Sequence, residues 1–81
     1  MEITLQPEDN HRLANLCGVL DENLKQIESA LDIKIARRGA HFRVTGEKQN
    51  TQLAAQLLES FYARSTKTID LEEIQLGLVE V

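Results

Sequence analysis

The sequence predicts an α+β domain in which three short strands form an antiparallel sheet and helices cover one face of it. Two observations carry this prediction. Apolar residues alternate with polar ones in three short segments, and they recur at helical spacing in four longer ones. The segments follow the order β-α-α-β-β-α with a further helix at the end, and a chain of 81 residues with 42% hydrophobic and 27% charged residues suits one small globular domain.

The first strand and the first helix are predicted close to the N-terminus. Ile3 and Leu5 alternate with polar neighbours, as in a strand that buries one face. Pro7 fits the first turn of the helix that follows, and the two acidic residues after it suit the positive end of the helix dipole. We expect this helix to end near Cys17, because Gly18 is a typical residue directly after a helix.

The second helix and a β-hairpin are predicted next. Asp21 is expected to cap the second helix, whose apolar residues recur at helical spacing as Leu24, Ile27 and Leu31. Alternation then predicts strands over 32–37 and 41–45, joined by a glycine-containing turn at 38–40. The expected inner face of the sheet consists of Ile3, Leu5, Ile33, Ile35, Phe42 and Val44.

Two helices are predicted in the C-terminal half. A long one runs from about Lys48 to Arg64, with an apolar stripe of Leu53, Ala54, Leu57, Leu58 and Phe61. Asp70 and Glu73 have the spacing of a capping box at the start of the last helix, which has its own stripe of Leu71, Ile74 and Leu78. Because this helix lacks a stop signal, we expect a domain over 1–65 and a linker and helix over 66–81 that lead to a domain absent from this chain. The alternative is that the helix simply packs on the domain.

Composition excludes several classes of function. A net charge of −4 excludes nucleic-acid binding through bulk charge, so any such binding requires a local patch. Cys17 has no partner for a disulfide and no histidine placed to activate it, so we expect a small buried hydrophobe, and both His11 and His41 are expected to be solvated. With these few soft ligands no metal site is predicted. The absence of a membrane-spanning run or a signal peptide predicts a cytoplasmic protein without a membrane partner.

The best functional signal is a group of cations in the hairpin of an otherwise acidic chain. Lys34, Arg37, Arg38 and Arg43 lie within ten residues of one another. Alternation places Lys34 and Arg43 opposite the apolar face, hence on the open face or at the edge of the sheet. Such a patch can contact RNA phosphates at modest affinity. The alternative is a solvated hairpin without a ligand.

The element order resembles that of type I KH domains, in which a Gly-x-x-Gly loop between the first two helices clamps single-stranded nucleic acid. Here the loop position holds Gly18, Val19, Leu20 and Asp21, and the sequence Asn-Leu-Lys-Gln-Ile-Glu at 23–28 resembles the start of KH second helices. More closely, residues 16–28, the Arg-Arg-Gly run at 37–39 and the Phe-Arg-Val-Thr-Gly run at 42–46 are similar to the N-terminal region of PhoH-like proteins.

The PhoH-like resemblance implies a small KH-like domain ahead of a P-loop ATPase domain, a link to RNA metabolism and, in bacteria, an endoribonuclease partner. It also implies that the full-length protein binds ATP and Mg²⁺. This chain holds no Gly-x-x-x-x-Gly-Lys-Ser/Thr motif, so no ATP-binding residue can be carried over, and we expect no enzyme activity and no cofactor in these residues. Ala40 after Gly39 departs from the family, in which Asn is often expected.

The loop also departs from a working KH clamp. Asp21 and Glu22 stand where phosphate would sit, so we expect a degenerate loop whose carboxylate is used for capping the second helix. Two hypotheses follow. The chain is either an RNA-associated accessory domain of a PhoH-like ATPase or a protein-interaction or oligomerisation module with no nucleic-acid role.

Overall fold

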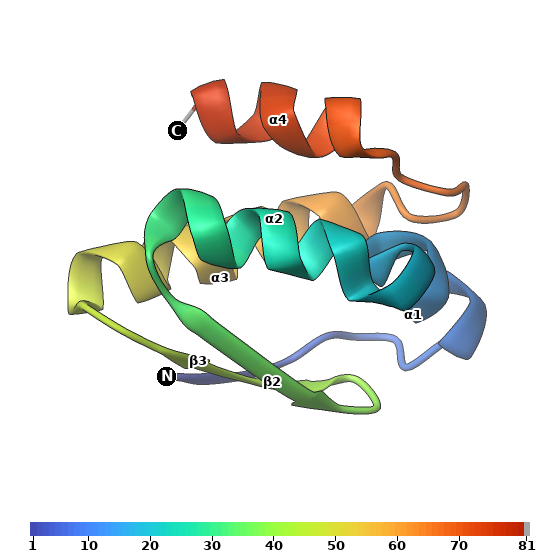
Figure 1. Ribbon diagram of the computed structural model, residues 1–81. Helices are drawn as coiled ribbons and strands as arrows, with labels where there is room; N and C mark the ends of the chain where they lie inside the picture. The colour runs from blue at the N-terminus through green and yellow to red at the C-terminus, as the bar shows by residue number, and fades with distance from the viewer. Residues whose placement is uncertain (81) are drawn as a thin grey trace.

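The computed structural model describes residues 1–80 and confirms the predicted α+β architecture (Figure 1). The elements in chain order are β1 (Glu2–Thr4), α1 (Asn10–Cys17), the 3₁₀ turn η1 (Val19–Asp21), α2 (Glu22–Leu31), β2 (Lys34–Arg38), β3 (His41–Thr45), α3 (Lys48–Ala63) and α4 (Leu71–Glu80). Val81, the last residue of the predicted C-terminal segment, lies outside the described residues.

The three strands form one antiparallel sheet in the order β1-β3-β2, so β3 is central. Phe42 and Val44 of β3 are fully buried beneath the helices, opposite Ile3 and Ile35 of the two edge strands. Leu5 and Ile33 lie just outside the strands and are also buried. The predicted inner face is therefore correct, and Figure 1 shows α2 and α3 on this side with the other face of the sheet bare.

The start of α1 differs from the prediction. The helix begins at Asn10, and the side chain of Asp9 caps it by accepting hydrogen bonds from the amides of His11 (2.9 Å) and Arg12 (3.2 Å). Pro7 therefore precedes the helix instead of occupying its first turn. An aspartate that satisfies two free amides stabilises a helix start more directly than a proline does, which is why the boundary lies here.

Helix α4 packs on α2, on the side away from the sheet, and makes a third layer (Figure 1). Ile74 is fully buried. One half of the predicted capping box at the start of α4 is confirmed, since the Asp70 carboxylate accepts the amide of Glu73 at 2.9 Å. Gly77 lies directly against the ring of Phe61 in α3. Leu76 and Val79, by contrast, are exposed on the outer face of α4.

One buried amide side chain joins three segments of the helical layer. Asn23, at the start of α2, is fully buried, and its Nδ2 donates to the carbonyl oxygens of Leu16 (2.9 Å) and Ile69 (2.7 Å). These bonds connect α2 to the last turn of α1 and to the segment before α4. Within residues 1–80, no helix combines the length and the apolar character that a bilayer span requires.

Candidate nucleic-acid interface

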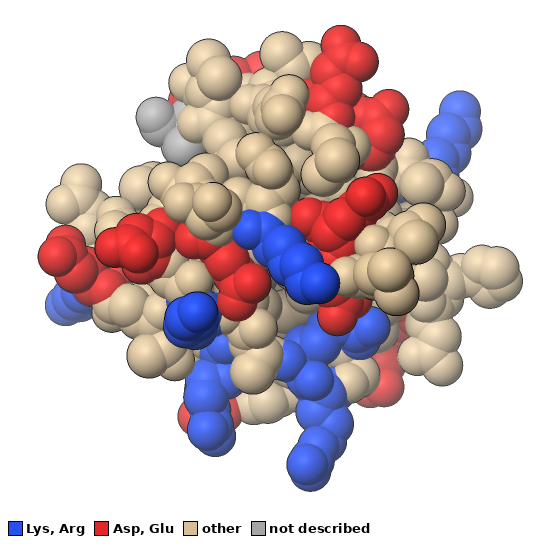
Figure 2. Space-filling model, in the orientation of Figure 1, with Lys and Arg blue, Asp and Glu red and all other residues tan. Residues whose placement is uncertain are grey.

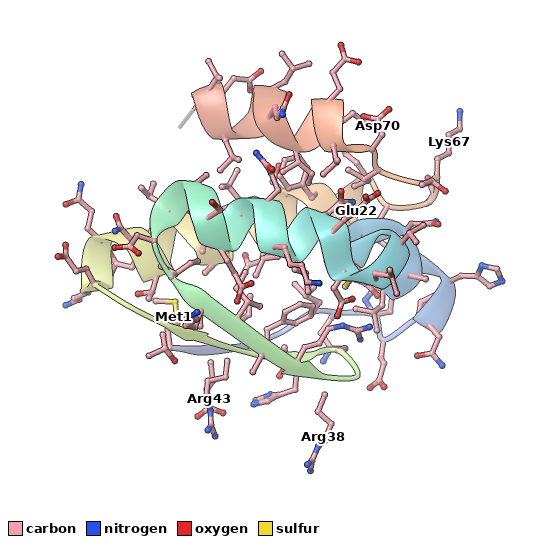
Figure 3. All side chains as sticks on the ribbon, viewed as in Figure 1. Met1, Glu22, Arg38, Arg43, Lys67 and Asp70 are labelled. Atoms are coloured by element: carbon pink, nitrogen blue, oxygen red, sulfur yellow. The ribbon has the colours of Figure 1, made fainter. Side chains whose placement is uncertain are left out.

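The open face of the sheet carries three of the four predicted cations. Lys34 and Arg38 alternate with inward residues on β2, and Arg43 does so on β3, so all three side chains are exposed on one face. Figure 3 shows Arg38 and Arg43 pointing away from the helices, and in Figure 2 Lys and Arg side chains gather along the sheet side of the molecule. A shallow hollow of about 350 Å³ lies here, lined by Ala36, Arg37, Arg38, His41 and Arg43.

Arg37 borders this hollow, but its side chain does not project with those of the other three cations. It stands opposite Phe42 in the register, and therefore its side chain leaves β2 on the helix-covered side. There it donates to the carbonyl oxygen of Gly39 at 3.1 Å and lies beside Cys17. The four cations are close in sequence but divided between the two faces of the strand, as period-two alternation requires.

A carboxylate reduces the positive charge of the open face. Glu2 of β1 accepts a 2.7 Å hydrogen bond from His41 Nε2 and lies 4.0 Å from Arg43 Nη2. These neighbours, His41 first, hold the pKa of Glu2 below its usual range, so the carboxylate stays ionised on mild acidification. Three cations and one carboxylate leave a surplus of two positive charges. The His41 side chain is about half exposed, as expected. It also has a second neighbour besides Glu2, since Thr4 Oγ1 lies 3.1 Å from its Nδ1.

The loop between α1 and α2 contradicts the prediction that Asp21 caps the second helix. Its side chain makes no hydrogen bond to the amides of α2. Leu20 (φ 53°) and Asp21 (φ 58°) are both in the left-handed region, as is Gly18 (φ 78°). A capping residue requires extended backbone so that its side chain reaches back to the helix. The left-handed turn directs the carboxylate elsewhere, and the interpretation of this loop as a capping device is wrong.

The same loop presents two apolar side chains to solvent. Val19 is 74% exposed and Leu20 is 84% exposed. The left-handed conformation costs a non-glycine residue about 1–2 kcal/mol, so Leu20 combines backbone strain with apolar exposure. Strained loop residues concentrate at functional sites, which favours a contact between this tip and another molecule. Sequence reasoning assigned these residues to a loop but had no signal for the strain.

We expect Leu20→Gly to raise the free energy of unfolding by up to about 1 kcal/mol, because glycine tolerates the left-handed region while a nearly fully exposed leucine loses no burial. Leu20→Ala is the matched control, since it shortens the side chain and keeps the backbone restriction. Urea denaturation of both variants measures the difference. Equal stabilities for the two variants would show that the loop stores no strain.

Cys17 is buried at the end of α1, as predicted. Burial, with a smaller contribution from Asp21, raises the pKa of its thiol to about 11, although Arg37 acts in the opposite direction. The thiol is therefore protonated at neutral pH and packs as a small apolar group. Among residues 1–80, no three His, Cys, Asp or Glu side chains converge as metal ligands.

The open face and the loop tip are thus two surfaces with chemical features beyond those of packing. Sequence analysis identified the cations of the open face but missed the Glu2–His41 pair. These two residues are 39 positions apart in the chain, and the pairing of β1 with β3 brings them together. No protein-family model matches this sequence, and no solved structure matches the chain.

Proposed function

We propose that this domain is a non-catalytic accessory module that contacts the phosphates of single-stranded RNA weakly through the open face of its sheet. The observation that carries the proposal is the placement of Lys34, Arg38 and Arg43 on one exposed face of a chain whose net charge is −4. The strands place no Phe, Tyr or Trp on this face, and the only ring there is that of His41, which Glu2 and Thr4 hold, so base stacking contributes little. Binding is therefore electrostatic, independent of sequence and sensitive to salt.

The resemblance to PhoH-like proteins gives this module its context. In this proposal the domain precedes a P-loop ATPase domain, the full-length protein binds ATP and Mg²⁺, and it acts in cytoplasmic RNA metabolism, with an endoribonuclease as a possible partner. The β-α-α-β-β-α order supports the KH-like part. Asp21 and Glu22 oppose phosphate at the KH-type loop by charge, which leaves the sheet face as the site of contact. A Walker A motif in the next ~50 residues of the gene would test the family assignment.

The RNA contact is tested by fluorescence anisotropy with a labelled oligouridylate at two salt concentrations. Wild-type binding is expected no tighter than ~10⁻⁴–10⁻⁶ M. Arg38→Ala and Arg43→Ala should each lower the salt slope by about one unit for every phosphate that the variant no longer neutralises. Arg37→Ala is the matched control, because it removes the same charge from the opposite side of the strand, and we expect it to bind nearly as wild type does.

Two outcomes would contradict this proposal. If Arg37→Ala weakens binding as much as Arg38→Ala, only the overall charge matters and the open face is not a site. If the open-face variants bind like wild type while Asp21→Gly abolishes binding, the loop is a working clamp.

Glu2→Gln should strengthen RNA binding, in the opposite direction to the arginine variants, because it removes the one carboxylate that neutralises this face.

The second candidate function is a protein-interaction or oligomerisation module with no nucleic-acid role. The exposed apolar tip formed by Val19 and Leu20 favours it. In this case the domain shows no salt-dependent RNA binding, and sedimentation velocity detects self-association that Leu20→Ala reduces. A monomer at all concentrations that also binds RNA through Arg38 and Arg43 would exclude the oligomerisation form of this alternative.

A further inference from the structure

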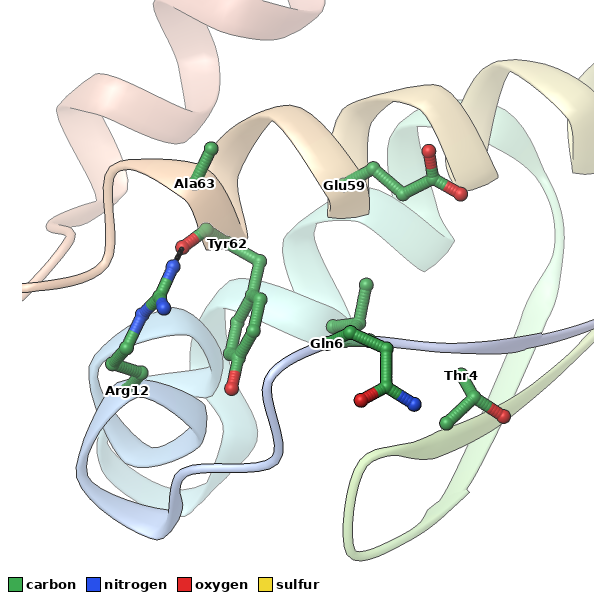
Figure 4. Close-up of a pocket in the computed structure, with 7 residues that line it drawn as sticks. Thr4, Gln6, Arg12, Glu59, Tyr62 and Ala63 are labelled. Atoms are coloured by element: carbon green, nitrogen blue, oxygen red, sulfur yellow. Dashed lines mark hydrogen bonds between the residues drawn. The ribbon is translucent and has the colours of Figure 1, made fainter.

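A groove runs between the outer edge of β1 and helix α3 (Figure 4). Its volume is about 440 Å³, and it is lined by Thr4, Leu5, Gln6, Arg12, Glu59, Tyr62 and Ala63. One wall of this groove consists of Thr4, the last residue of the edge strand β1, and of Leu5 and Gln6, which follow it. The other wall is the side of α3 that carries Glu59 and Tyr62.

The backbone of β1 is available for pairing on this side. Ile3 of β1 pairs with Phe42, and the amide of Leu5, just after the strand, donates to the carbonyl of Ala40 at 2.9 Å, so the backbone groups of the odd-numbered residues here are turned toward β3. By alternation, the N–H and C=O groups of Glu2 and Thr4 point outward. Within residues 1–80, no backbone hydrogen bond to another element uses them. Such an edge is a template for one more strand.

The opposite edge of the sheet is partly closed. On β2 the outward amide of Ile35 donates to the Glu28 carboxylate at 2.7 Å. A side chain from α2 therefore occupies a position that an added strand needs. This contrast identifies β1 as the edge that can accept a strand.

A fixed cation stands at the end of the groove. Arg12 of α1 donates through Nη2 to the carbonyl of Tyr62 at 2.7 Å, and its guanidinium carbon lies 4.4 Å from the centroid of the Tyr62 ring. Its Nε is buried without a hydrogen-bond partner, and no carboxylate within residues 1–80 forms an ion pair with it. Tyr62 is held in turn by its hydroxyl, which donates to the carbonyl of Pro7. Arg12 is thus pre-positioned for an anion that the domain itself does not supply.

We infer that this groove binds an extended peptide segment of a partner protein, which adds a fourth strand to β1 and places a carboxylate beside Arg12. Figure 4 shows Arg12 and Glu59 on opposite sides of the Tyr62 and Gln6 side chains, so the two ends of the groove have opposite charges. A segment with a basic residue at one end and a carboxylate at the other matches this arrangement. The site is separate from the RNA surface, because it uses the edge of the sheet and not its open face.

The probes are three synthetic peptides with an acetylated N-terminus. Two have the sequence Lys-Val-Thr-Val-Thr-Val, one with a free C-terminus and one with a C-terminal amide. The third is also an amide and has glutamate in place of the last valine. They are titrated into the whole ¹⁵N-labelled chain and followed by NMR. We expect the shifts to concentrate at the amides of Glu2, Thr4 and Gln6, with a carboxylate peptide binding about tenfold more tightly than the plain amide. The better of the two acidic peptides identifies a terminal or a side-chain carboxylate.

Two variants and one control make the inference specific. Arg12→Gln removes the charge but keeps a donor for the Tyr62 carbonyl, and it should abolish the preference for a carboxylate. Arg64→Gln is the matched control, since Arg64 also stacks on an aromatic ring (5.0 Å from the Phe61 centroid) but does not line the groove. Thr4→Pro removes an outward N–H without a change in charge and should prevent binding of all three peptides.

Equal affinity of the acidic peptides and the plain amide would overturn the role of Arg12. The groove would be overturned as a strand acceptor if the shifts are confined to another surface, or if millimolar peptide causes no shifts. The RNA titration of Arg12→Gln keeps the two proposals distinguishable. It should match wild type whether or not the peptide binds, because Arg12 is not on the open face.

Discussion

Asn23→Asp is expected to lower the free energy of unfolding by about 3–5 kcal/mol, because it places a charge in a fully buried site and removes two donors at once. The new oxygen would face the carbonyls of Leu16 and Ile69, which the Nδ2 group now reaches at 2.9 and 2.7 Å. Residue 23 lies in the first turn of α2, where a carboxylate gains only about 0.3–1 kcal/mol from the helix dipole. The buried repulsion is larger, so the net effect is destabilising.

Asn15→Asp is the matched control for this variant. Asn15 Nδ2 also donates to a distant carbonyl, that of Ser65 at 2.8 Å, but its side chain is only partly buried. A loss of about 1 kcal/mol is expected there. Urea denaturation at neutral and at acidic pH compares the two, and the deficit of Asn23→Asp should shrink at low pH as the buried carboxyl takes up a proton. Equal losses at both positions would show that burial of Asn23 adds nothing.

Gly77→Ala is expected to destabilise the domain by about 2 kcal/mol, although alanine is the better helix former by about 1 kcal/mol. A Cβ at this position would lie 3.0 Å from Cε1 of Phe61 and closer still to its Cζ. The Phe61 ring is fully buried and cannot move aside, so α4 must shift away from α3. The measurement is the midpoint of chemical denaturation.

Two further variants separate this clash from a general sensitivity of α4. Leu76→Ala changes an exposed neighbour on the same helix and should be nearly neutral. Phe61→Leu makes room for the added methyl group, so Gly77→Ala should cost less in that background than in wild type. A stabilising effect of Gly77→Ala in the wild-type background would show that α4 is not closely packed on Phe61.

The order of elements could be predicted from the sequence because alternation and helical spacing are local patterns. The cap at Asp70 was predicted correctly for the same reason, since the residue that it caps is three positions away. The start of α1 was misplaced because Pro7 was assigned to its first turn and Asp9 only to the helix dipole, whereas the Asp9 side chain caps the helix. The cap at Asp21 failed because Asp21 is the last residue of the 3₁₀ turn and has a left-handed backbone there.

The candidate sites were predictable in part for a related reason. The cations of the hairpin are close in sequence, but the prediction grouped Arg37 with the other three, whereas the register places it on the opposite side of the strand. Nothing in the local pattern indicated that Arg12 meets Tyr62, fifty residues later, or that Asn23 meets Ile69. Such contacts exist only after the helices pack, and for this reason the groove beside β1 has no signal in the sequence.

The central strand has neighbours at very different distances along the chain. β2 and β3 are joined by a two-residue turn, whereas Thr4 of β1 pairs with His41, thirty-seven residues away. Closing a long loop costs more chain entropy than closing a hairpin and is slower, so we expect the hairpin to form first and β1 to join it later. The strand beside the groove would then be added late in folding, and a segment that pairs with it would act on a late step of assembly.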